Sequence, residues 1–278
     1  MSVEQSLLGQ TTSYPTEYAP EILFPIARAP SRASYAAIAG IAQGMDWWHA
    51  FELSWLDNQS KPQVAIGRLH VPAHSDYLIE SKSLKLYFNS LNFKQFDHQA
   101  ALIDCVEADL SRVANAAIKL ELYAADGLAV SQPVGFCLDA LTPNGCNTVP
   151  DAQLLQFDPA QDAASQGNAA LIETSVYSHL LRSNCPVTGQ PDWGTLFIRY
   201  QGMAPCYSSL LAYIISYRQH SGFHEQCVEQ IFADIWRHLQ PKRLMVYAAY
   251  TRRGGLDINP CRVSDLDWLP APIRLARQ

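Results

Sequence analysis

The chain has 278 residues, 48% of them hydrophobic and 17% charged, which suffices for one large or two smaller domains with a sizeable core. Its formal net charge of −6 argues against direct binding of nucleic acid, because nucleic-acid binders are usually basic. The first ten residues lack the basic and apolar segments of a secretory signal, and no apolar stretch is long enough to cross a membrane. The seven cysteines are irregularly spaced. We therefore expect a cytoplasmic protein with reduced thiols.

The predicted elements form two similar halves on either side of a linker. Residues 1–45, rich in Pro, Ser, Tyr and Ala, are predicted to be an N-terminal extension, and residues 139–167, with several Pro and Gly residues, a linker. In the first module, residues 46–138, we predict strands over Val64–Val71 and Leu84–Ser90, a helix over Ala100–Ala117 and a strand over Ile118–Tyr123. In the second module, residues 168–278, we predict strands over Leu196–Tyr200 and Leu210–Tyr217, a helix over Phe223–Leu239 and a strand over Met245–Tyr250.

The two halves are predicted to be diverged copies of one unit. Three segments of the first half recur in the same order in the second, with offsets of 124, 127 and 125 residues. The pairs are Lys119–Ala125 with Arg243–Ala249, Phe96–Gln99 with Phe223–Gln226, and Ala108–Arg112 with Ala233–Arg237. Strands and helices in this order indicate an α+β fold of antiparallel sheets with helices packed on one face.

A reactive thiol is the strongest functional candidate. Cys185 is followed by Pro186 and Gly189, which indicate a loop, and by Asp192 at the start of a predicted strand. A thiolate is the nucleophilic form of cysteine and a nearby carboxyl moves protons, so the pair suggests covalent catalysis by sulfur. The alternative is that Cys185 is a small buried hydrophobe, like most cysteines.

The first copy does not repeat this pair. Aligning Pro62 with Pro191 places Leu56 opposite Cys185 and Gln63 opposite Asp192. The thiol and the acid therefore belong to the second copy alone.

Two residues at the start of the last predicted helix are candidates for substrate binding. A carboxylate at Glu225, beside His224, is able to accept hydrogen bonds from a purine-like edge. Alternatively, Glu225 is a favourable first-turn residue for the helix dipole and His224 a surface histidine.

Basic residues in both halves are candidates for binding phosphate. Lys82 lies between two serines and suits phosphate capture, whereas we interpret Lys85 as a solvated lysine at a strand end. Arg253 and Gly254 bring a guanidinium and backbone N–H groups together, as phosphate sites and ordinary turns both do. The chain has no Rossmann or Walker motif, and no cysteine pair with zinc-site spacing, so we expect no metal.

Together these motifs resemble the NADPH-dependent 7-cyano-7-deazaguanine reductases, the QueF family of nitrile reductases, in their long bimodular form. The resemblance rests on Glu80–Tyr87, Ser183–Trp193, Phe223–Cys227 and Arg252–Pro260, and it extends from about Leu8 to Gln278. It implies tandem tunnelling-fold (T-fold) modules that assemble around a barrel, here as a homodimer. It also implies reduction of the nitrile 7-cyano-7-deazaguanine to 7-aminomethyl-7-deazaguanine with two NADPH, in the queuosine modification of tRNA.

The resemblance further implies a role for each candidate residue. Cys185 is expected to be the nucleophile that forms a thioimide, and Asp192 the proton donor. The expected contacts to the deazapurine substrate are Ile79, Glu80, Ser81, His224 and Glu225, and those to NADPH are Ser81, Lys82, Arg253 and Gly254.

Two alternative functions share the same fold. A GTP-cyclohydrolase-like T-fold enzyme requires zinc ligands, for which the sequence offers no convincing set. A non-catalytic purine-binding T-fold protein has no need of Cys185, Asp192 and Glu225 together.

Overall fold

The computed structural model describes residues 13–38, 40–159 and 171–278, and these divide into two compact units. The first unit contains the described residues up to Ser34, Met45–Val130 and Arg252–Ile258. The second contains Tyr35–Gly44, Ser131–Thr251 and Asn259–Gln278, apart from residues outside the described ranges. Part of the predicted linker, residues 160–167, lies outside the described residues.

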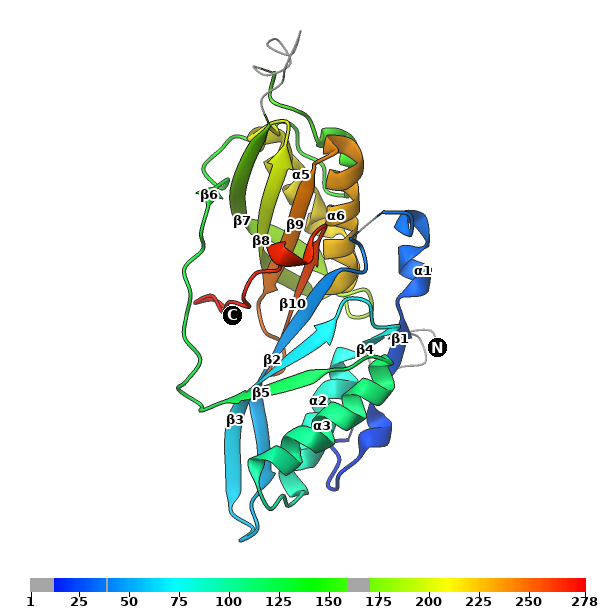
Figure 1. Ribbon diagram of the computed structural model, residues 1–278, viewed down its shortest axis with the longest axis vertical. Helices are drawn as coiled ribbons and strands as arrows, with labels where there is room; N and C mark the ends of the chain where they lie inside the picture. Colours follow the sequence, from blue (N-terminus) through cyan, green and yellow to red (C-terminus); the bar gives the residue numbers. More distant parts are fainter. Residues whose placement is uncertain (1–12, 39, 160–170) are drawn as a thin grey trace. The chain divides into compact units, whose positions relative to one another are not determined.

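The first unit is an antiparallel sheet with two helices on one face (Figure 1). Its strands pair in the order β5-β3-β2, and a separate antiparallel pair joins β1 to β4. The bounds are β1 Pro25–Ala27, α1 Ala29–Arg32, β2 Gly44–Leu56, β3 Pro62–Pro72, β4 Tyr77–Ile79, α2 Ser81–Ser90, α3 Gln99–Ala114 and β5 Lys119–Tyr123. The buried face of α3 presents Leu102, Val106 and Leu110, whose spacing of three to four residues follows the helical period.

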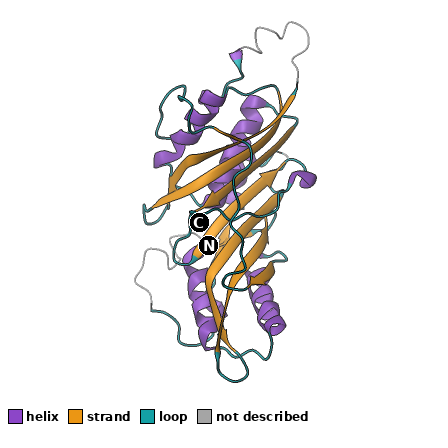
Figure 2. Cartoon of the chain, turned by 90° about the vertical axis from the view of Figure 1, so that its left-hand side faces the viewer, coloured by secondary structure: helices purple, strands orange, loops and turns teal. Residues whose placement is uncertain are grey.

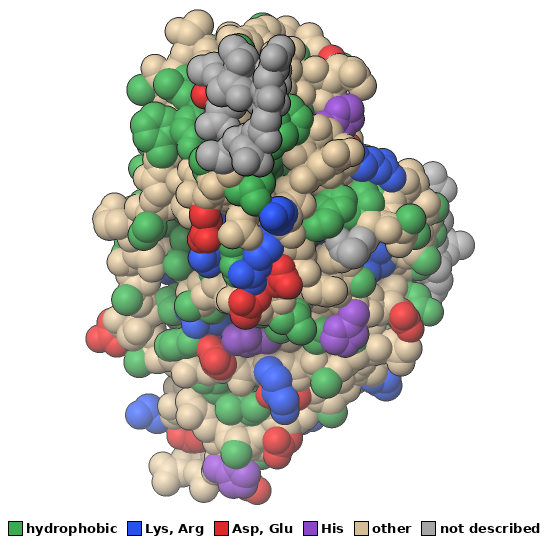
Figure 3. All heavy atoms as spheres, turned by 45° about the horizontal axis from the view of Figure 1, so that its top comes forward, with side chains coloured by type: hydrophobic (Ala, Val, Ile, Leu, Met, Phe, Trp, Pro, Cys, Tyr) green, Lys and Arg blue, Asp and Glu red, His purple; other side chains and the backbone are tan. Residues whose placement is uncertain are grey.

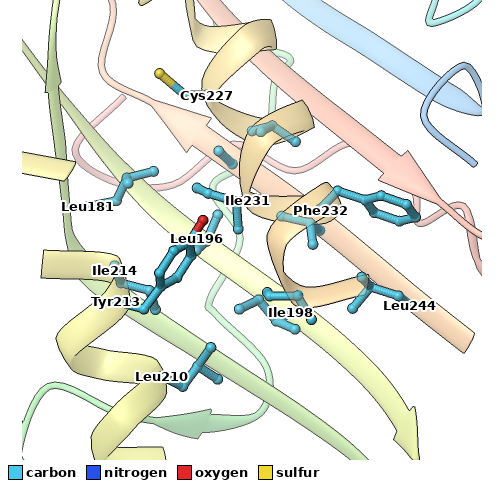
Figure 4. Packing of buried hydrophobic residues seen from close by; sticks show 14 of the residues in the cluster. Leu181, Leu196, Ile198, Leu210, Tyr213, Ile214, Cys227, Ile231, Phe232 and Leu244 are labelled. Carbon is cyan, nitrogen blue, oxygen red and sulfur yellow. The ribbon is translucent and has the colours of Figure 1, made fainter. Parts of the chain in front are cut away.

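The second unit repeats this plan with the strand order β10-β9-β8-β7-β6, antiparallel except where β6 joins β7. The bounds are β6 Phe136–Cys137, β7 Ile172–Asn184, β8 Pro191–Gly202, α5 Tyr207–Ser216, α6 His224–Leu239, β9 Arg243–Tyr250 and β10 Leu256–Val263. Its core lies between the two helices and the sheet, where Ile231 and Phe232 of α6 meet Leu196 and Ile198 of β8 (Figure 4). Figure 2 shows the strands and helices of each unit as separate layers. The expected α+β class with antiparallel sheets is confirmed.

Two of the predicted strands are wrong. Leu84–Ser90 lies in α2, and Leu210–Tyr217 lies in α5 and the 3-10 turn that follows it. A short apolar run fits a buried strand and a buried helix equally well, so periodicity alone does not separate them. For α2 the missed signal is the N-cap: the Glu80 carboxylate accepts hydrogen bonds from the backbone N–H groups of Lys82 and Ser83.

The hairpins of the two units have matching registers. Pairing between β2 and β3 shifts between Ala50 and Leu53, and pairing between β7 and β8 shifts at the corresponding place, between Ser178 and Leu181. Each hairpin then closes at a proline that begins the second strand. These parallels support the interpretation of the two halves as diverged copies.

A tyrosine–aspartate hydrogen bond also recurs in each copy. Tyr87 of α2 donates to Asp109 of α3 at 2.8 Å, and Tyr213 of α5 donates to Asp234 of α6 at 2.6 Å. Each bond ties the two helices of one unit together. The repeated Ala-Asp in the sequence therefore has a structural role in both copies.

The hairpin registers correct one part of the sequence alignment. Leu56 pairs with Pro62 as Asn184 pairs with Pro191, so Leu56 corresponds to Asn184 and Asp57 to Cys185. The predicted match of Leu56 with Cys185 is wrong because the second hairpin loop is one residue longer than the first.

Charge is mixed on the molecular surface that Figure 3 presents, where acidic and basic side chains are interspersed. Among the described residues, no helix is both long and apolar enough to cross a membrane.

Candidate functional site

The loop that carries Cys185 is closed by its own backbone. The N–H of Cys185 donates to the carbonyl oxygen of Gln190 at 2.9 Å, and its carbonyl accepts from Gly189 at 3.0 Å. Gly189 has φ of +67°, a left-handed conformation that favours glycine. Cys185 is only 8% exposed, so the loop holds the thiol in a fixed and largely buried position.

The same loop is tied to the start of α6. Asn184, which precedes Cys185, donates its N–H to the carbonyl of His220 at 2.8 Å and accepts from Gly222 at 3.1 Å. These bonds bring the end of β7 beside the segment that leads into His224 and Glu225. The structure thus groups Cys185, Asp192, His224 and Glu225 at one end of the sheet of the second unit.

Asp192 and His224 are direct neighbours. Asp192, the second residue of β8, is 3% exposed and lies opposite Ser183 in the hairpin. Nε2 of His224 is 3.4 Å from Oδ2 of Asp192. The imidazole also stacks on the ring of Tyr250, with centroids 3.8 Å apart and planes 5° apart. A buried carboxyl and a histidine of fixed orientation therefore share one site.

The histidine retains a polar atom for a ligand. Nδ1 of His224 is buried and has no hydrogen-bond partner among the described residues. Such atoms are rare in folded proteins, because an unmade hydrogen bond in the interior is costly. A ligand that bonds to Nδ1 removes this cost.

Glu225 is a buried carboxyl in the first turn of α6, at 3% exposure. It lies near Cys227, whose thiol is fully buried. Burial, assisted by the charges of Asp192 and Glu225, raises the pKa of Cys227 to about 12. Cys227 therefore stays a neutral thiol at physiological pH and does not compete with Cys185 as a thiolate.

In the first unit, the predicted residues Ile79, Glu80, Ser81 and Lys82 lie at the end of β4 and the start of α2. The Glu80 carboxylate, 1% exposed, accepts from the N–H groups of Lys82 at 2.6 Å and Ser83 at 2.8 Å. Burial raises the pKa of Glu80, and these two hydrogen bonds oppose the rise. Ile79 is buried at the end of β4, whereas Ser81 and Lys82 are partly exposed in the first turn of the helix.

Gly254 and Gly255 form a tight two-residue turn. Their φ values are +58° and +79°, and the backbone of Arg253 exchanges hydrogen bonds with Leu256 on either side. A Cβ atom at Gly254 would lie 3.0 Å from Nζ of Lys85. Glycine therefore allows the lysine to approach the turn closely.

Lys85 and this turn border a cavity of about 200 Å³. It is lined by Tyr14, Ala50, Glu52, Lys85, Phe88, Asn89, Asn92, Gly254, Gly255 and Leu256. The predicted position of Lys85 at a strand end is wrong, because Lys85 is on α2, where it is partly exposed and lies beside the glycine turn. The lining brings together a lysine, two asparagines and the carboxylate of Glu52, and such a mixed set of donors and acceptors suits a polar ligand.

The sequence does not assign Lys85 or Tyr250 to these candidate sites. Lys85 is interpreted from sequence as a solvated lysine because its segment is predicted to be a strand. Tyr250 is predicted only as the end of a strand, because its stack on His224 depends on the pairing of β8 with β9. Among the described residues, no group of three or more His, Cys, Asp or Glu side chains is arranged to hold a metal ion.

Known proteins match the chain along its whole length. A family profile described as "Nitrile reductase, 7-cyano-7-deazaguanine-reductase N-term" matches residues 14–122, and one described as "QueF-like protein" matches residues 191–266. The chain is 66% identical to proteins of Acinetobacter baumannii (strain AYE) and Acinetobacter baylyi, and 48% identical to one of Psychrobacter cryohalolentis. Each alignment covers 100% of both chains, and each relative is named "NADPH-dependent 7-cyano-7-deazaguanine reductase".

A solved structure of the archaeosine synthase QueF-Like in the apo form is also similar, with a TM-score of 0.30 and 14% identity over 34% of this chain and 94% of that chain. The full-length identity to the three named relatives, with the two family profiles, decides the classification. The chain belongs to the QueF family of nitrile reductases.

Proposed function

We propose that this chain catalyses the NADPH-dependent reduction of 7-cyano-7-deazaguanine to 7-aminomethyl-7-deazaguanine, in the cytoplasm, as a step of tRNA queuosine biosynthesis. The observation that carries the proposal is the buried thiol of Cys185 at the same end of the sheet as the Asp192–His224 pair. The 66% identity to reductases of this name supports it.

The chemistry begins at Cys185. A nitrile carbon is electrophilic but a poor acceptor of hydride, so prior addition of sulfur divides a difficult step into easier ones. The sulfur forms a bond to the nitrile carbon, and the electrons of one C–N π bond take a proton to form N–H. Asp192 supplies that proton. The product is a thioimide on Cys185, held where water is largely excluded.

The substrate ring is recognised in the second unit by Glu225 and His224. The Glu225 carboxylate accepts hydrogen bonds from the N–H groups of the deazapurine edge, and Nδ1 of His224 bonds to a further polar atom. For the first unit we propose Ile79, Glu80 and Ser81 as the substrate contacts that family membership implies.

NADPH, when bound, would supply the two hydrides that convert the thioimide to the amine. The C–S bond would break after the first hydride addition, which returns Cys185 as a thiolate and leaves an imine, and the second hydride, with one further proton, would give the amine. Ser81, Lys82, Arg253 and Gly254 are proposed to hold this cofactor, and Lys85 joins them. Lys85 supports this assignment, because it places a positive charge beside the glycine turn, while the carboxylate of Glu52 against the same turn opposes an anion there.

We also propose that the two units are tandem T-fold modules and that the protein is a homodimer without direct affinity for nucleic acid. The tyrosine–aspartate hydrogen bond between the two helices and the register of the hairpin recur in both units, and this supports the tandem arrangement. Light scattering after size-exclusion chromatography measures the oligomeric state directly.

Glu225→Leu is expected to weaken substrate binding and leave NADPH binding near normal. Loss of the Glu225 carboxylate leaves buried hydrogen-bond donors of the substrate unpaired, which weakens the binding free energy by about 1–3 kcal/mol, and by more if the groups are charged. Titration calorimetry with the nitrile substrate measures the change. Glu173→Leu, which removes an exposed glutamate paired with Arg199 at the surface, is the control. Unchanged substrate affinity in Glu225→Leu contradicts the assigned role.

Lys85→Ala is expected to raise the KM for NADPH about tenfold or more, because a hydrogen bond to a charged group contributes about 1.5–3 kcal/mol. The adduct between Cys185 and the nitrile should still form, since that step uses no cofactor. The control is Lys119→Ala, which removes the same charge from an exposed lysine bonded to Glu107. The difference between the parent and Lys85→Ala should shrink at high salt. Equal NADPH dependence in Lys85→Ala and Lys119→Ala contradicts the assignment.

A further inference from the structure

The last ten residues of the second unit cross the sheet face opposite its helices (Figure 1). Ile273 bonds to the Tyr247 hydroxyl through its backbone N–H at 3.4 Å and its carbonyl at 3.5 Å. Tyr247 alternates along β9 with Val246 and Ala248, which face the helices, so its ring lies on the other face. The segment then ends with Leu275 and Gln278 both buried.

The side-chain amide of Gln278 uses both its donors and its acceptor. Nε2 donates to Oδ1 of Asn259 at 2.7 Å and to the carbonyl of Tyr250 at 3.1 Å, while Oε1 accepts from the N–H of Leu275 at 2.7 Å. Oδ1 of Asn259 also accepts from the N–H of Tyr250 at 3.0 Å. The two buried amides therefore satisfy both backbone polar groups of Tyr250.

Arg277 secures the neighbouring strand. Its guanidinium donates to the carbonyls of His179 and Gly194 and, at 3.2 Å, to the hydroxyl of Thr195. Gly194 pairs with Tyr250 across the sheet, and a Cβ atom there would lie 3.2 Å from the Tyr250 ring. Arg277 binds β8 and Gln278 binds β9 at the point where the ring of Tyr250 lies close against Gly194 and leaves little room for a larger residue.

Tyr250 connects the C-terminal residues to the candidate site, because it contacts both Gln278 and His224. Its backbone is held on one face of the sheet by Gln278, and its ring lies on the other face, stacked on His224. His224 in turn lies 3.4 Å from Asp192. A displacement of the Tyr250 backbone moves the surface on which the imidazole rests.

We propose that Gln278 is a positioning residue for nitrile reduction, which holds Tyr250 and through it the His224–Asp192 pair. The inference rests on the function proposed above for His224 and Asp192. Gln278 acts from the opposite face of the sheet and contacts neither of them.

The test is a double-mutant cycle with Gln278→Ala and His224→Ala in the full-length protein. Gln278→Ala should raise the KM for the nitrile and lower kcat, so that kcat/KM for the nitrile falls by about tenfold or more. Small misplacements of catalytic groups cost large factors in rate. The KM for NADPH should not change. In the His224→Ala background, Gln278→Ala should change these parameters by less than about twofold, since coupled residues are not additive.

The control is Ile273→Ala, which shortens a side chain of the same segment and keeps the backbone bonds to Tyr247; it should behave like the parent protein. If Gln278→Ala does not fold, Gln278→Glu decides by the same criteria, because it keeps the acceptor for Leu275 and loses the donors. Equal effects of Gln278→Ala with and without His224 overturn the positioning role. Parent-like Gln278→Ala beside an impaired His224→Ala overturns this inference alone, and parent-like His224→Ala overturns both this inference and the proposed role of His224.

Discussion

Cys185→Ala is expected to abolish nitrile reduction, with a loss of at least about a thousandfold in kcat/KM, as is usual when a covalent nucleophile is removed. The fold should persist, because the hydrogen bonds that close the loop use the backbone of Cys185 and remain available to alanine. Intact-mass spectrometry with the nitrile and no NADPH checks the prediction. The parent protein should gain one substrate mass, and Cys185→Ala should gain none.

The other cysteines provide the controls. Cys146 is exposed, so Cys146→Ala should keep both the adduct and full turnover. Cys227 is the neighbouring thiol, but its pKa of about 12 keeps it protonated at neutral pH. An adduct that persists in Cys185→Ala, and maps to another cysteine by peptide sequencing, moves the nucleophile away from Cys185.

Cys185, the proposed nucleophile, and its neighbours could be predicted as a group from sequence because they are local. Cys185 and Asp192 lie on one hairpin, and His224 and Glu225 are adjacent at a helix start. Periodicity and turn residues place such groups correctly. The pairing of His224 with Asp192 joins two such segments and follows from the structure.

The features that sequence did not reveal depend on strand register. The stack of Tyr250 on His224 and the hold of Gln278 on Tyr250 require β8, β9 and β10 to pair in one register, which no motif records. Strand register also explains why the predicted match of Leu56 with Cys185 is wrong. The loop of the second hairpin has one extra residue, which shifts the correspondence between the two copies by one position.

The helices α2 and α5 were missed for a different reason. Both are ten residues long, and both lie against another helix of their unit. Seven of the ten residues of α5 are apolar, whereas α2 has four, of which Leu84, Leu86 and Phe88 alternate with other residues as they would in a strand. At that length an apolar run carries few helical turns, so the alternation that marks a strand and the period that marks a helix are hard to separate. The N-cap at Glu80 distinguishes a helix from a strand in α2, whereas Cys206, the N-cap residue of α5, makes no side-chain cap hydrogen bond.

Arg262→Met is expected to destabilise the protein by about 3–5 kcal/mol, because it leaves a buried carboxylate without its counter-charge. Arg262 of β10 and Glu229 of α6 are fully buried, and the guanidinium donates to the Glu229 carboxylate at 2.7 and 3.2 Å. Glu229 lies one turn after Glu225 on the same helix face, so the pair also anchors the turn that carries Glu225. Urea unfolding, followed by fluorescence, measures the change.

Two comparisons separate loss of the ion pair from loss of packing. The double variant Glu229→Met with Arg262→Met should recover most of the stability, since apolar side chains of similar size replace a buried ion pair at little cost. Arg199→Met breaks the exposed pair of Arg199 with Glu173 in the same unit, and should cost about 1 kcal/mol or less. If the double variant is no more stable than Arg262→Met alone, the lost stability comes from the shape of the arginine and its other hydrogen bonds, such as that to the Cys261 carbonyl, and the isolated charge of Glu229 is not the cause.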